Sequence, residues 1–69
     1  MNVVIWFFDK DGKKLRYEMT RQGVTGPYRL VVTDPDGLVS VEEVQEPLEL
    51  IQRSLHLVNS LKNQGWRVT

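Results

Sequence analysis

Two short turn sequences of the same kind constrain the fold of this chain more than any other feature. Asp9-Lys10-Asp11-Gly12 and Asp34-Pro35-Asp36-Gly37 each stand between segments rich in branched and aromatic residues. Aspartate and glycine in this order are typical of hairpin tips, because both residue types tolerate the backbone angles of tight turns. The chain is therefore predicted to form two successive β-hairpins.

The first hairpin is predicted to join strands at residues 3–8 and 14–20. A type I turn followed by glycine in the left-handed conformation gives a three-residue loop, which pairs Asp9 with Lys13. This pairing places one apolar set on one face of the hairpin: Val3, Ile5, Phe7, Leu15, Tyr17 and Met19. The other face would then carry Val4, Trp6, Phe8, Lys14 and Arg16.

The second hairpin is predicted to join strands at residues 28–33 and 38–44, and its register is open between two alternatives. Turn chemistry pairs Leu30 with Glu42. The alternation of apolar residues instead favours Val39 and Val41 on the same face as Leu30, which would require a four-residue loop or a bulge.

A helix is predicted at residues 47–64, because proline suits the first helical position and Gly65 suits a left-handed stop. Its apolar positions cover an arc of about 180°, wider than the roughly 100° that one sheet face requires. One stripe is assigned to the core: Leu48, Ile51, Leu55 and Val58. The flanking positions are a candidate helix interface: Leu50, Leu57 and Leu61.

These elements define an α+β fold in which an antiparallel four-stranded sheet from two hairpins (ββββα) carries one C-terminal amphipathic helix on one face. We expect residues 1–69 to form a single domain. Residues 66–69 either add a short last strand or fold Trp66 back over the helix. The predicted core comprises Val3, Ile5, Phe7, Leu15, Tyr17, Leu30, Val32, Leu48, Ile51, Leu55 and Val58.

The composition argues against a metal centre or a cofactor site. The 69 residues include no cysteine and a single histidine, His56, so neither a disulfide framework nor a histidine-rich zinc cluster is expected. The spacing of Asp9, Asp11 and Glu18 resembles part of an EF-hand loop, but Phe7 occupies the first ligand position. The same aspartates are sufficiently explained as turn residues, so we expect no metal.

Catalytic residues are not expected either. His56 falls on the polar side of the predicted helix and has the features of a solvated surface histidine. Glu42 and Glu43 are neighbours on a predicted strand, so their carboxylates point to opposite faces. The protein is therefore predicted not to be an enzyme.

The surface predicted to matter most is the sheet face that combines aromatic and basic residues. Its members are Val4, Trp6, Phe8, Lys14, Arg16 and Arg29. Such a face is typical of a subunit interface, and the favoured function is a self-associating protein-interaction module, most simply a homodimer. The alternative is a module that binds single-stranded nucleic acid by stacking bases on the rings. A further interpretation is an ordinary surface, on which Arg16 and Lys14 lay their side chains over the rings by cation–π contact. An unidentified protein partner is also left open.

Charge and hydropathy add two further expectations. Residues 1–33 hold six basic and three acidic residues and residues 34–69 the reverse, so the halves carry net charges of +3 and −3. In a dimer these halves favour an antiparallel arrangement. No apolar run is long enough to span a bilayer and no signal peptide is evident, so a cytoplasmic protein without membrane contact is expected.

Overall fold

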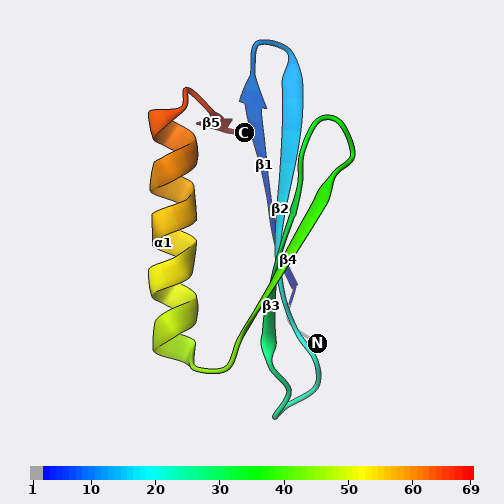
Figure 1. Cartoon of the computed structure of the whole chain (residues 1–69), viewed down its shortest axis with the longest axis vertical. Coiled ribbons are helices and arrows are strands. Elements are labelled where there is room, and N and C mark those ends of the chain that lie inside the picture. Colours follow the sequence, from blue (N-terminus) through cyan, green and yellow to red (C-terminus); the bar gives the residue numbers. More distant parts are fainter. Residues whose placement is uncertain (1–2) are drawn as a thin grey trace.

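The computed structural model describes residues 3–69, which form an antiparallel sheet of five strands with one helix on one of its faces (Figure 1). The strand order is β4-β3-β2-β1-β5, so the four long strands follow one another as a meander. The elements are β1 (Val3–Lys10), β2 (Lys13–Arg21), β3 (Tyr28–Thr33), β4 (Val39–Val44), α1 (Pro47–Asn63) and β5 (Arg67–Val68). The predicted α+β fold with its ββββα order is confirmed, and β5 is the short last strand that was one of the two alternatives for the tail.

The first hairpin turns more tightly than predicted. Lys10 pairs with Lys13, which leaves only Asp11 and Gly12 in the loop, and their φ angles are 51° and 77°. Two consecutive positive φ angles define a type I′ turn, whose twist matches that of the flanking strands. The predicted pairing of Asp9 with Lys13 is wrong, because Asp9 pairs with Lys14.

This shift by one residue exchanges the two faces of β1. Phe8 lies opposite Leu15 and Trp6 opposite Tyr17, whereas Phe7 lies opposite Arg16. Because side chains alternate along a strand, the even-numbered residues of β1 share a face with the apolar residues of β2.

The second hairpin follows the register that turn chemistry predicts, with Leu30 opposite Glu42. Its loop is wider than the first one, since the last ladder pair joins Thr33 and Val39. The Asp34 carboxylate closes the loop by accepting bonds of 2.9 Å from the backbone N–H groups of Asp36 and Leu38. A two-residue turn would make Pro35 a ladder position, and proline has no N–H for that role.

The helix ends in a Schellman motif that redirects the chain toward the sheet. Gly65 has a φ of 97°, and its N–H donates to the carbonyl of Lys62 at 3.0 Å. The N–H of Trp66 donates to the carbonyl of Leu61 at 3.0 Å, which completes the motif. The two alternatives for the tail occur at the same time. Trp66 packs against the core, and β5 pairs with β1.

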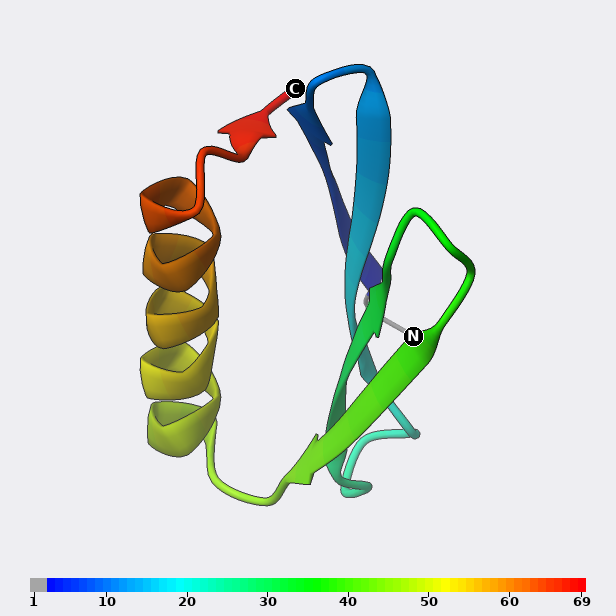
Figure 2. The ribbon, with the colours of Figure 1, turned by 45° about the horizontal axis from the view of Figure 1, so that its top comes forward.

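The core lies between α1 and the helix-facing side of the sheet. Its buried apolar residues are Phe8, Leu15, Tyr17, Leu30, Val44, Leu50 and Leu61. Val32 and Val58 pack against this cluster as predicted, and so do Trp6 and Leu57. Figure 2 shows the helix running along one face of the sheet. We call the other face, which α1 does not cover, the open face.

Several predicted core positions are wrong. Ile5 and Phe7 lie on the open face of the sheet, and Leu48, Ile51 and Leu55 are exposed on the helix. The side chain of Val3 lies outside the described part of the chain. The buried side of α1 is formed by Leu50, Ser54 and Leu61. The stripe that was predicted to be buried is therefore mostly exposed.

Candidate interaction surface

The residues predicted to form one aromatic and basic face are divided between the two faces of the sheet. Trp6 and Phe8 face α1, and Phe8 is fully buried. Arg16 pairs across the ladder with Phe7 on the open face, so it lies on the other side from Trp6. The type I′ turn causes this separation, because it moves each β1 residue to the face opposite the predicted one.

Val4, Lys14 and Arg29 follow the same division. Val4 alternates with Trp6 on the helix-facing side and is exposed near the start of β1. Lys14 and Arg29 lie on the open face with Arg16. The structure therefore does not bring these three cations together with Trp6 and Phe8.

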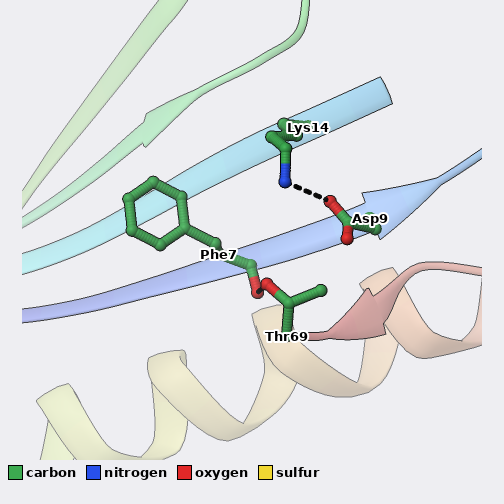
Figure 3. A network of polar contacts seen from close by, with 4 residues as sticks. All are labelled: Phe7, Asp9, Lys14 and Thr69. Atoms are coloured by element: carbon green, nitrogen blue, oxygen red, sulfur yellow. Dashed lines mark hydrogen bonds and ion pairs between the residues drawn. The ribbon is translucent and has the colours of Figure 1, made fainter. Parts of the chain in front are cut away.

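On the open face each of these cations has a carboxylate partner. The closest contacts are 3.3 Å between Lys14 Nζ and Asp9 Oδ1, 2.7 Å between Arg16 Nε and Glu18 Oε1, and 3.7 Å between Arg29 Nε and Glu43 Oε2. Figure 3 shows the Lys14–Asp9 pair and, beside it, the Phe7 ring on the side of β1 away from the helix. The face is locally neutral, which gives little attraction for a polyanion.

The candidate helix interface is also placed differently from the prediction. Leu50 and Leu61 are buried in the core and Leu57 is half-buried, so these three leucines serve packing within the protomer. Sequence reasoning missed the reason for this orientation, which is Ser54. The hydroxyl of Tyr17 donates a 2.9 Å hydrogen bond to Ser54 Oγ, and this buried bond fixes the serine side of the helix on β2.

The Tyr17 ring is held from a second direction by Trp6. Their ring centroids are 5.1 Å apart and the planes are inclined by 12°, a stacked arrangement. Burial raises the pKa of the Tyr17 hydroxyl above the usual 10.0; the bond to Ser54 opposes this effect and Glu42 adds to it. The tyrosine is therefore neutral at physiological pH and acts as a structural donor.

The exposed apolar surface gathers on the side of α1 that faces β1. Leu48, Ile51 and Leu55 expose 67%, 56% and 59% of their surface, and we call these three residues the apolar flank. They follow one another at spacings of three and four residues, so they form one continuous stripe. Such a stripe is unusual on a helix that already has its core side buried.

A cleft adjoins the apolar flank between α1 and the β1 end of the sheet. Its lining is almost entirely apolar and consists of Trp6, Phe8, Ser54, Leu55, Val58 and Val68. Leu55 belongs to both features, so the flank and the cleft form one surface. This surface comes from three segments that are distant in sequence, namely β1, α1 and β5.

The opposite flank of α1 is polar and closed by ion pairs. Arg53 binds Glu42 of β4 at 2.5 Å and Glu49 of its own helix at 3.5 Å. The cleft beneath is lined in part by His56, Ser40 and Ser60. Within residues 3–69, no hydrogen bond joins His56 to a serine or a carboxylate.

Two further findings bear on function. In the part of the chain that the structure describes, no group of three or more histidine, aspartate or glutamate side chains is arranged to hold a metal ion, and Asp11 occupies the hairpin tip. No helix over the same residues is long and apolar enough to cross a bilayer.

Comparison of the chain with protein-family models, with curated proteins and with solved structures found no match. The functional assignment therefore depends on the geometry of the chain itself.

Proposed function

We propose that this protein is a non-enzymatic interaction module that self-associates into a homodimer through the apolar flank and the adjoining cleft. The observation that carries the proposal is the continuous apolar surface formed by Leu48, Ile51 and Leu55 with the cleft above β1. Removing such a surface from water is the main favourable term in most protein association.

The charge distribution around α1 supports the same side as the interface. The apolar flank is bordered on its solvent side by Gln52 and Asn59, which are uncharged, whereas Glu49 and Arg53 lie on the opposite flank. Interface centres are depleted of charged residues, because burying an unpaired charge is costly. A second protomer can therefore cover the flank from Leu48 to Leu55 without desolvating a charge, because the charged residue that continues this stripe, Lys62, lies two turns beyond Leu55.

The small core gives a reason for association. Below about 70–80 residues a single core rarely supplies more than 3–5 kcal/mol, and oligomerisation is one of the usual reinforcements. The chain has no cysteine for a disulfide. Burial of the flank between two copies would extend the apolar cluster beyond one protomer.

Single-stranded nucleic-acid binding, the alternative function, has less support. The Trp6 ring is stacked on Tyr17 on the helix-facing side, so it is not available to stack on a base on the open face. The cations of the open face are paired with carboxylates. Phe7 is the one aromatic side chain among the described residues that this face exposes.

Sedimentation velocity at several concentrations tests the proposal, with Leu55→Lys as the disrupting variant. Val39→Lys is the matched control, since Val39 is 58% exposed on the far edge of the open face. We expect the wild type and Val39→Lys to dimerise and Leu55→Lys to sediment as an 8.0 kDa monomer. A wild type that remains monomeric at high micromolar concentration contradicts the proposal.

A further inference from the structure

The outer edge of β1 is covered by β5 over only a small part of its length. β5 pairs with Phe8 and Asp9, and the last bonds on this edge come from Thr69. The backbone N–H of Thr69 and its Oγ1 both donate to the carbonyl oxygen of Phe7, at 2.9 and 3.1 Å (Figure 3). From Phe7 toward Val3, no strand among residues 3–69 pairs with this edge.

The Phe7 carbonyl shows which backbone groups point outward. In an antiparallel ladder the N–H and C=O of one residue point to the same neighbour, and successive residues alternate between neighbours. Since the Phe7 carbonyl points to the β5 side, so do the backbone groups of Val3 and Ile5. The groups of Val4 and Trp6 point to β2 instead.

The sequence of this open edge contains none of the features that usually prevent strand pairing. From Val3 to Phe8 there is no charged residue and no proline, and the ladder with β2 runs without a bulge. Edge strands are ordinarily protected by charges, proline, bulges or cover. The other edge of the sheet, β4, carries Glu42 and Glu43.

The open edge and the apolar flank are centred at the same level of the molecule. Trp6 lines the cleft with Ser54 and Leu55, and β1 and α1 run in the same direction (Figure 1). A step of two residues along β1, from Trp6 toward Val4, covers about 6.6 Å, and the same distance along a helix takes about four residues. Val4 therefore lies level with Leu50 and Ile51, and Ile51 is the middle residue of the apolar flank.

We propose that β1 pairs with β1 of a second copy, antiparallel about a two-fold axis at Val4, so that the two sheets become one. The inference rests on the proposed function and specifies its geometry. Val3 and Ile5 would form two hydrogen-bonded pairs with the partner copy, contributing four backbone bonds. Both helices would lie on the same face of the joined sheet, with the two apolar flanks facing each other across the two-fold axis.

Thr69 selects this register over its neighbour. An axis at Ile5 would set Val3 against Phe7 of the second copy, where that copy's own Thr69 already occupies the Phe7 carbonyl. An axis at Val4 uses only Val3 and Ile5 as bonding residues, and these are free of β5. The pairing therefore uses no backbone group that β5 or Thr69 occupies.

A second copy is favoured over an unrelated strand because the two features share one axis. A two-fold at Val4 brings Ile51 against Ile51 of the other copy, so the edge and the flank are covered by one operation. Pairing of β1 with β4 of another copy would cover the edge but not the flank. That arrangement is heterologous and would continue into open polymers.

Cysteine cross-linking tests the register directly, because the protein has no cysteine of its own. Val4 and its copy would form a non-hydrogen-bonded pair with Cα atoms about 4.5 Å apart, within the range of a disulfide. We expect Val4→Cys to oxidise to a disulfide dimer at low micromolar concentration. Val39→Cys, exposed on β4, is the control that reports random collision.

A second variant tests the backbone bonds. Ile5→Pro removes an outward N–H, whereas Ile5→Ala keeps that N–H and loses the side chain. We expect Ile5→Pro to weaken dimerisation about tenfold or more and Ile5→Ala to retain it, with circular dichroism confirming that both are folded.

The outcomes separate the two proposals. A wild-type dimer in which Val4→Cys cross-links no faster than Val39→Cys, or in which Ile5→Pro dimerises normally, overturns the strand pairing and leaves the self-association proposal standing. Concentration-dependent polymers instead of dimers also overturn it. A monomeric wild type overturns both.

Discussion

Phe7 and Phe8 are adjacent residues of the same type with opposite environments. Phe8 is 0% exposed under α1, whereas Phe7 is 46% exposed on the open face. The difference does not come from the residues themselves, because both are phenylalanine in the middle of an apolar run. It comes from the turn three residues later, which fixes the register and thereby the face of every residue in β1.

The register also gives the two sides of the sheet different surfaces. The helix-facing side combines the buried core with an apolar surface that continues onto α1. The open side carries Ile5 and Phe7 as neighbours on β1, and ion-paired residues such as Arg16 and Glu18 lie opposite them on β2. Apolar side chains that are interrupted by ion pairs are ordinary on a protein surface, whereas the proposed dimer depends on the continuous apolar flank of α1.

The largest expected effect is the contrast between the two phenylalanines. Phe8→Ala should destabilise the protein by about 3–5 kcal/mol, which is comparable to the whole stability expected of a domain this small. Phe7→Ala should cost less than about 1 kcal/mol, because the ring is already in contact with water. Chemical denaturation of both variants measures the difference. Equal losses would mean that the register of the first hairpin is wrong.

A similar contrast is expected between two leucines of α1. Leu61→Ala removes a core side chain and should cost about 2–5 kcal/mol, whereas Leu55→Ala should change monomer stability by less than about 1 kcal/mol. Thermal unfolding should be followed at low micromolar concentration, below the range in which the proposed dimer would form. A large loss for Leu55→Ala under those conditions would place Leu55 in the monomer core.

The smallest effect concerns Tyr17 and depends on pH. Tyr17→Phe removes the bond to Ser54 and should cost about 1 kcal/mol at neutral pH. The pKa of Tyr17 is raised in the folded state, so the stabilisation that the buried neutral tyrosine provides is complete below pH 10. That contribution is lost as the pH rises from 10 through the folded pKa.

Urea denaturation between pH 8 and pH 11 measures this dependence. The wild type should lose more stability than Tyr17→Phe above about pH 10, because the unfolded chain releases the tyrosine proton more readily. Parallel pH profiles for the two proteins would mean that Tyr17 is not buried.

The two hairpin tips show how far turn chemistry can be read from sequence. Both contain Asp-x-Asp-Gly. In the second hairpin the sequence left two registers open, and the structure has the one that turn chemistry favours, with Leu30 opposite Glu42. The first was predicted one residue too wide. Lys10 can join the ladder whereas Pro35 cannot, so the same pattern closes after two residues in one hairpin and later in the other.

The sequence also did not determine which side of α1 faces the sheet. Two stripes of similar hydrophobicity run along the helix, and the stripe that is buried contains the polar residue Ser54. Hydrophobicity alone favours Leu48, Ile51 and Leu55 for the core. The stripe with Ser54 is buried because the Tyr17 hydroxyl donates a hydrogen bond to Ser54 across the interior. A pairing of residues 37 positions apart is not visible in the sequence pattern of the helix.

The sequence by itself determined the order and type of the elements, from the two turn patterns to Pro47 and Gly65 at the ends of the helix. These signals are local, since each depends on backbone preferences within a few residues. The tertiary structure decided which faces are buried and which remain open. β1 has two apolar faces and α1 has two apolar stripes, so only packing against the rest of the chain could distinguish Phe8 from Phe7 and Leu61 from Leu55.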